Sequence, residues 1–127
     1  MAIITEDYVS YEVAKLLKEK GFDEPCYTCY IDDEISHYEY SSTNFELIDG
    51  VISAPTLQMT MKWLREVRNI HIIVNPYTDK EGQHWSFIFD KYAYDFWQEL
   101  GIYITESWGS YEEACEIAIK YCLKYLV

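Results

Sequence analysis

The sequence predicts an α+β domain in which an antiparallel sheet is covered by helices. Three stretches carry apolar residues at helical spacing next to capping residues, and several others alternate apolar and polar residues as strands do. Half of the 127 residues are hydrophobic, which is enough to bury a core. A chain of this length forms one core, so residues 1–127 are expected to be a single globular domain.

The first part of the chain predicts a helix followed by a hairpin. Ser10 is placed to cap a helix over residues 11–20, and Gly21 is placed to end it. Residues 26–40 contain two β-rich runs around the acidic residues 32–34, a pattern typical of a hairpin. The acidic turn lacks the glycine bend and the distal glutamate of a calcium loop, so we interpret it as a solvated tip.

The stretch VISAPTLQMTMKWLREV, residues 51–67, predicts an amphipathic helix. Ser53 or Ala54 is expected at the cap and Pro55 in the first turn, where its missing N–H costs nothing. Asn69 is expected to end the helix. The predicted buried face consists of Leu57, Thr60, Met61, Leu64 and Val67.

The rest of the chain predicts strands and a final helix, so that the second half follows the order α-β-β-β-α. The predicted strands cover residues 70–74, 84–90 and 102–106. A turn near residues 79–82 would join the first two strands as a hairpin, and residues 92–100 give no clear pattern. The large aromatic residues expected in the core are Trp63, Trp85, Phe87 and Phe89.

The C-terminal helix is predicted to begin at a capping box formed by Ser110 and Glu113. Glu116 and Lys120 are spaced as a favourable i, i+4 pair on its outer side. Its apolar face is predicted at Ala114, Ile117, Ala118, Tyr121 and Tyr125.

Charge is distributed unevenly along the chain. The formal net charge is −12, and residues 1–50 hold 12 acidic residues against 3 lysines, a net charge of −9. Residues 51–80 hold 4 basic and 2 acidic residues and form the only basic island. This balance argues against unaided binding to phosphate backbones or anionic lipid. With no leader-like N-terminus and no long apolar run, the chain is expected to be cytoplasmic and to bind no membrane.

The four cysteines are interpreted as reduced structural thiols. Cys26 and Cys29 have C-x-x-C spacing, but Cys115 and Cys122 are seven residues apart on a helix, roughly 10 Å along its axis. The two pairs therefore do not converge on one tetrahedral ion, and no metal site or cofactor is expected.

No catalytic residue is assigned from the sequence. His71 and His84 could approach each other across the second hairpin, and with a cysteine and an acid nearby a nucleophilic triad could be assembled. No nucleophile lies on a recognisable elbow, and scattered histidines such as His37 are usually hydrogen-bonded surface or core residues. An enzyme is therefore the weakest of the hypotheses.

Three motifs carry a resemblance to other proteins: YVSYEVAKLLKEKGFDEPC, ISAPTLQMTMKWLREV and SYEEA. With these motifs the chain resembles a set of small proteins encoded by gut Bacteroidales, their phages and their mobile elements. The resemblance implies this genomic setting, and no activity, cofactor or catalytic residue comes with it. The α-β-β-β-α order also resembles double-stranded RNA-binding domains, but the last helix opens Tyr111, Glu112, Glu113 where those domains present lysines.

Two surfaces are candidates for binding a protein partner. The helix stripe, which consists of Gln58, Lys62, Arg65 and Asn69, lies opposite the predicted buried face and carries two of the few positive charges. Tyr27, Tyr38 and Tyr40 exceed what one small core needs, and tyrosine is favoured at binding surfaces. The competing interpretations are a solvated helix face and ordinary β-forming tyrosines.

The sequence therefore favours a non-enzymatic interaction or regulatory module of a mobile element, a phage or its host, with an unidentified protein partner. One alternative is an acidic DNA mimic or inhibitor that occupies a basic site, which would have a contiguous acidic face. The interaction module would instead have mixed charge around an aromatic patch. A second alternative is a small hydrolase using Cys26 or His71, which requires a pocket that brings a nucleophile to a base.

The charge layout predicts no binding to duplex DNA or RNA at physiological salt, because each phosphate contact needs a lysine or arginine and this chain has 10 in all. A mobility-shift titration into the low micromolar range checks this. A shifted band that weakens as salt is raised would contradict it.

Overall fold

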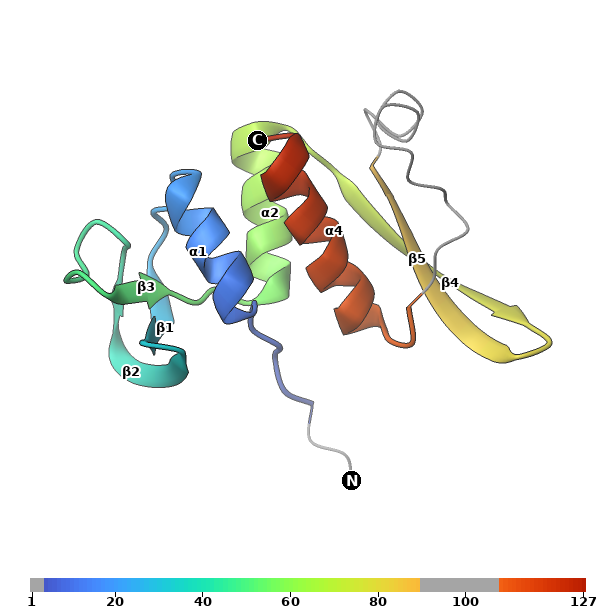
Figure 1. Ribbon diagram of the computed structural model, residues 1–127, viewed down its shortest axis with the longest axis horizontal. Coiled ribbons are helices and arrows are strands. Elements are labelled where there is room, and N and C mark those ends of the chain that lie inside the picture. The colour runs from blue at the N-terminus through green and yellow to red at the C-terminus, as the bar shows by residue number, and fades with distance from the viewer. Residues whose placement is uncertain (1–3, 90–107) are drawn as a thin grey trace.

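The computed structural model describes residues 4–89 and 108–127, and in these ranges three helices pack between two small antiparallel sheets (Figure 1). The predicted α+β class is confirmed, with the strands divided between two sheets. The predicted strand at residues 102–106 and the unassigned residues 92–100 lie outside the described residues. No helix in the described ranges has the length and hydrophobicity needed to cross a membrane. The helices are α1 (Tyr11–Glu19), α2 (Leu57–Arg68) and α4 (Tyr111–Tyr125).

Helix α1 begins and ends where the sequence predicts. The Ser10 hydroxyl accepts the Val13 N–H at 3.2 Å, which satisfies one of the free donors of the first turn. Gly21 has a φ of 91°, and the Phe22 N–H donates to the Leu17 carbonyl at 2.9 Å, which gives the glycine-terminated helix end. This turn buries the Phe22 ring, so the end of α1 is tied into the core.

Helix α2 begins later than predicted, because the chain before it is still part of a sheet. Ser53 pairs with β1, and the Ala54 N–H donates to the Thr28 carbonyl at 2.8 Å. Neither Ser53 nor Ala54 is free to cap a helix, so that prediction was wrong. Thr56 is the cap, and Pro55 precedes it instead of occupying the first turn.

The end of α2 explains which of its residues are buried. Asn69 ends the helix in the left-handed conformation, with a φ of 55°, as predicted. The left-handed residue changes the direction of the chain and places Ile70 in the core, where the Ile70 N–H donates to the Leu64 carbonyl. Val67 therefore has no core to face and is 56% exposed, which corrects its predicted burial. The remaining predicted positions are buried as expected: Leu57, Thr60, Met61 and Leu64.

The first sheet has the strand order β2-β1-β3, with β1 in the centre. Its strands are β1 (Cys26–Ile31), β2 (Glu34–Ser42) and β3 (Val51–Ser53). Strands β1 and β2 form the predicted hairpin, closed by the pair Ile31 and Glu34. Asp32 in the two-residue turn has a φ of 58°, a conformation that aspartate tolerates better than most residues. The acidic turn is exposed, as predicted.

The second sheet is the hairpin of β4 (Ile72–Asp79) and β5 (Gly82–Phe89). Its register runs without interruption from the pair Ile72 and Phe89 to the pair Asp79 and Gly82. His84 lies opposite Tyr77, whereas His71 precedes the pair at the other end of the hairpin. The proposed approach of the two histidines was therefore wrong.

The inner side of this hairpin joins the core. Phe87 and Phe89 are buried as predicted, whereas Trp85 is only half-buried. Trp85 instead exchanges two backbone hydrogen bonds with Trp108, at 2.8 and 2.9 Å. These bonds attach the start of the α4 segment to β5.

The buried face of α4 differs from the predicted one. Ser110 caps the helix as predicted, with its hydroxyl accepting the Glu113 N–H at 3.1 Å. Ile117 and Tyr121 are only half-buried and Tyr125 is 54% exposed. Helix α4 packs against α1, α2 and the β4–β5 hairpin at once, so its buried surface is broader than one stripe. The buried residues are Ala114, Cys115, Ala118, Ile119, Cys122 and Leu123.

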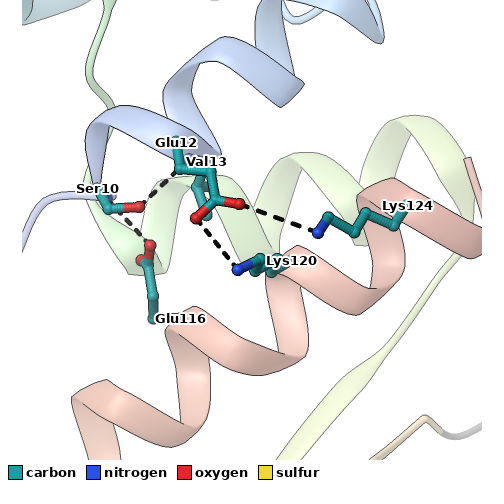
Figure 2. A network of polar contacts seen from close by, with 6 residues as sticks. All are labelled: Ser10, Glu12, Val13, Glu116, Lys120 and Lys124. Carbon is teal, nitrogen blue, oxygen red and sulfur yellow. Dashed lines mark hydrogen bonds and ion pairs between the residues drawn. The ribbon is translucent and has the colours of Figure 1, made fainter.

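Polar contacts connect α1 with α4 at the surface of this core (Figure 2). Glu116 accepts the backbone N–H of Ser10 at 3.2 Å, and Lys120 lies 3.1 Å from Glu12. The predicted pair within α4, Glu116 with Lys120, is therefore replaced by contacts to α1. The hydrogen bond from Lys120 lowers the pKa of the Glu12 carboxyl. These contacts are exposed, so water and salt screen them and they contribute little to stability.

The helices run in the same general direction (Figure 1). At their starts, Tyr8 forms a β-bridge with Thr56, and Gln58 donates to the Tyr111 hydroxyl at 2.9 Å. At their ends, Arg68 donates to the Lys20 carbonyl. Aligned helix dipoles favour basic residues at the C-terminal ends and acidic residues at the N-terminal ends, and the chain supplies both. The basic last turns contain Lys18, Arg65, Arg68 and Lys124, and the acidic first turns contain Glu12, Glu112 and Glu113.

Substitution of Leu64 by alanine is expected to lower the free energy of unfolding by about 2–5 kcal/mol, because Leu64 is fully buried and the change leaves a cavity. Val67→Ala, in the same helix but exposed, is the matched control and should change stability by no more than about 0.5 kcal/mol. Urea denaturation of the two variants measures the difference. An equal loss of unfolding free energy in the two variants would contradict the assignment of Leu64 to the buried face and Val67 to the exposed face of α2.

Candidate functional site

A bulge in the outer strand of the first sheet gathers the predicted tyrosines. Thr28 pairs with His37 and Cys26 pairs with Ser42, so a step of two residues on β1 faces a step of five on β2. Residues 38–41 therefore lie opposite Tyr27 alone. Extra residues of this kind bend a strand and re-aim its side chains, and β2 is strongly curved in Figure 1.

The tyrosine patch, which we define as Tyr27, Tyr38 and Tyr40, is exposed. Its members are 61%, 49% and 81% accessible, respectively. Tyr30, on the same strand as Tyr27, is instead half-buried and donates its hydroxyl to the Val9 carbonyl at 2.8 Å. The sheet thus separates one structural tyrosine from three that face solvent, and a binding role for those three stays a prediction.

The hairpin that carries the tyrosine patch lies in an acidic segment of the chain. Residues 23–50, which include both strands of the hairpin, contain 8 acidic residues and no lysine or arginine. Glu39 lies between Tyr38 and Tyr40 in the bulge. Mixed charge was expected around an aromatic patch of an interaction module, whereas the charged residues of the hairpin that carries the patch are all acidic.

A pocket of about 250 Å³ opens beside Tyr27. It lies where the N-terminal segment, the start of β1 and the start of α2 meet. Most of its wall is aromatic or apolar, and the carboxylate of Glu6 is the one acidic side chain in its lining. The lining residues used below are Glu6, Tyr8, Pro25, Tyr27, Pro55 and Met59. No local sequence pattern predicts this pocket, because it is built from segments far apart in the chain.

One wall of the pocket is held in place by a chain of contacts. The rings of Tyr8 and His37 pack in a T-shaped arrangement, with centroids 5.4 Å apart and planes inclined at 71°. Nδ1 of His37 lies 3.2 Å from the hydroxyl oxygen of Thr28, which is itself buried. Tyr8 is also fixed through its backbone by the bridge to Thr56. The pocket therefore exists before any ligand binds.

The helix stripe is exposed, as predicted, but most of its residues have structural roles. Gln58 donates to the Tyr111 hydroxyl, and Asn69 forms the left-handed end of α2. Arg65 lies in the last turn, where a positive charge is favourable to the helix dipole. Lys62 is exposed and is not assigned to a cap, an ion pair or a hydrogen bond within the described residues. The stripe and the tyrosine patch belong to different elements.

The four cysteines are buried and are not paired with one another. Burial raises the pKa of the Cys26 thiol to about 11, an effect partly opposed by the neighbouring Ser53 hydroxyl. Burial also raises the pKa of the Cys29 thiol, which lies beside the Tyr38 hydroxyl. A nucleophilic cysteine needs a lowered pKa, so Cys26 has the opposite of what the hydrolase alternative requires.

The histidines and acids do not assemble into a metal centre in the part of the chain that the structure describes. Among residues 4–89 and 108–127, no three of the side chains His, Cys, Asp and Glu are grouped to hold an ion. His84 contacts Asp79 at 2.9 Å in the turn of the second hairpin, and His37 contacts Thr28. Both contacts are local to their sheets.

Comparison with known proteins yields no relative: no protein-family model, curated protein or solved structure matches the chain. Function is therefore inferred from the surfaces of the chain itself.

The buried thiols predict slow alkylation of the native protein. With a pKa of about 11 for both Cys26 and Cys115, on the order of one thiol in a thousand is ionised at pH 8, and burial blocks access as well. Intact-mass spectrometry after iodoacetamide treatment should show less than one label per native chain and complete labelling in denaturant. Labelling of Cys26 in the native protein as fast as in denaturant would contradict the burial and the raised pKa of this thiol.

Proposed function

We propose that the protein is a non-enzymatic interaction module, cytoplasmic and belonging to a phage, a mobile element or its host, that binds a protein partner through the tyrosine patch. The observation that carries the proposal is the exposure of three tyrosines at one bulge, with accessibilities from 49% to 81%. The genomic setting comes from the sequence resemblance alone.

The physical basis is the value of tyrosine at interfaces. A tyrosine offers a large apolar ring and a hydroxyl at little cost in side-chain entropy, and it is enriched among the residues that dominate binding energy. Exposed aromatic rings gain nothing from folding, whereas a partner that covers them removes apolar area from water. Bulges are frequent next to functional sites, which agrees with a bulge that presents Tyr38 and Tyr40.

The charge around the patch supports a basic partner surface. Glu39 lies within the bulge, and the hairpin carries no positive side chain to attract an acidic partner. Complementary charge speeds association and selects among partners. The same observation favours a second candidate function, an acidic inhibitor that covers a basic, nucleic-acid-binding site of its partner. The two candidates differ in outcome, because only the inhibitor competes with DNA or RNA for the partner.

The triple substitution of Tyr27, Tyr38 and Tyr40 by alanine is expected to weaken partner binding by at least about 30-fold, the effect of losing about 2 kcal/mol. Affinity capture from the native cell with mass spectrometry identifies the partner, and calorimetry with the purified partner gives the affinity. Tyr125→Ala, at an exposed tyrosine on α4, is the matched control and should bind normally.

A second comparison separates the two predicted surfaces. Reversal of Lys62 and Arg65 to glutamate should leave the affinity within about twofold if the tyrosine patch is the binding surface. Capture that survives the triple tyrosine substitution but is lost on charge reversal would refute the proposal and assign binding to the helix stripe. Melting curves of every variant show whether a lost partner reflects lost folding.

A further inference from the structure

The pocket beside the tyrosine patch has the size of a site for one side chain. Its volume of about 250 Å³ lies below the roughly 300–1,000 Å³ of pockets that hold drug-sized molecules. Tyr27 belongs both to the pocket wall and to the tyrosine patch, so a partner that lies on the patch can place one of its side chains in the pocket.

The walls match a long side chain with a cationic end. Pro25, Pro55 and Met59 provide apolar surface of the kind that packs against the methylene stem of lysine or arginine. Tyr8 and Tyr27 also line the pocket, and aromatic rings attract guanidinium and ammonium groups. Because His37 and Thr28 hold Tyr8, little ordering is needed when a side chain enters.

The charges near the pocket are negative. Glu6 lines it and is exposed, and no lysine or arginine contributes to the lining. Glu24 is close enough that its charge adds to the burial that raises the pKa of the Cys26 thiol in the pocket wall. A cation entering the pocket therefore meets Glu6 as the one charged residue of the lining.

The start of α2 does not turn the pocket into an anion site. A helix N-terminus attracts anions through its free N–H groups. Here the Leu57 N–H already donates to the Asp7 carbonyl at 2.9 Å, and the Met59 N–H donates to the Thr56 hydroxyl at 3.1 Å. These two donors are occupied within the chain, and Glu6 is the one charged residue of the lining, so the pocket favours a cation.

We propose that this pocket binds the arginine or lysine side chain of a basic partner segment that lies across the tyrosine patch. The proposal rests on the proposed function and adds to it the chemistry of the partner. The guanidinium or ammonium group would contact Tyr8, Tyr27 and Glu6.

Nuclear magnetic resonance titration of the ¹⁵N-labelled protein tests this site. The probes are the peptide acetyl-Gly-Gly-Arg-Gly-Gly-amide, the same peptide with lysine, and the same peptide with citrulline, which keeps the shape of arginine without its charge. The arginine and lysine peptides should shift the amide signals of Tyr8, Tyr27 and Met59 saturably. The citrulline peptide should bind at least about tenfold more weakly, since it lacks the charge–ring and charge–carboxylate attraction.

A charge-matched pair of variants separates the pocket from general electrostatic attraction. Glu6→Gln should weaken the arginine peptide about three- to tenfold, whereas Asp33→Asn, which removes the same charge at the hairpin tip, should change binding by less than about twofold. Both positions are exposed, so both variants are expected to fold. Equal weakening by the two variants, or equal binding of citrulline and arginine, would overturn the proposal.

The same titration distinguishes a failure of the pocket site from a failure of the proposed function. Peptide-induced shifts at Tyr38 and Tyr40 with none at Tyr8 would overturn the pocket site and leave the tyrosine patch as a binding surface. Conversely, saturable shifts at the pocket in a protein whose triple tyrosine variant keeps its partner would support the cation site and refute the proposed function.

Discussion

Both sheets of this protein depend on burial against one layer of helices. Within the described residues the β4–β5 sheet has two strands, and an isolated two-stranded hairpin is at best marginally stable in water. The β2-β1-β3 sheet has a central strand but an edge strand of only three residues. Because the described parts of the two sheets do not pair with each other, the helices between them must supply the shared core (Figure 1). Fully buried side chains on all three helices form its centre: Val13, Leu17, Leu64, Ile119 and Leu123.

This arrangement leaves most of strand β2 exposed to solvent. Strand β2 lies at the edge and has only two residues that are even partly buried, so packing does not fix the register of its far half. The bulge at residues 38–41 therefore costs the core little, and it exposes Tyr38 and Tyr40. A bulged, charged edge also resists pairing with other strands, which allows an exposed aromatic surface without edge-to-edge aggregation.

Local signals in the sequence predicted much of the helical framework and the first hairpin. Ser10, Ser110 and Asn69 could be assigned from the sequence because each forms its cap with residues one turn away. The cap of α2 could not, because whether Ser53 is strand or cap depends on its pairing with β1, which is distant in sequence. The face of α4 was misjudged for a similar reason, since three neighbours, and not one, determine which of its residues are buried.

The candidate site was likewise predicted only in part. The exposure of Tyr27, Tyr38 and Tyr40 was predicted from an excess of tyrosine, but their meeting at one bulge follows from a register that no local pattern specifies. The pocket was not predicted, because Tyr8, Tyr27 and Met59 come from three segments joined only in the fold. The helix stripe had a clear sequence signal, and the structure shows that dipole compensation and capping account for much of it.

The central claim is that the helix layer provides stability and the first sheet provides recognition. Hydrogen–deuterium exchange of the protein, alone and saturated with its captured partner, tests it most directly. The account predicts new protection of the amides around Tyr27 and at residues 38–41, with exchange along the exposed face of α2 unchanged. Protection confined to α2 around Lys62 and Arg65, with the bulge exchanging as in the free protein, would contradict it.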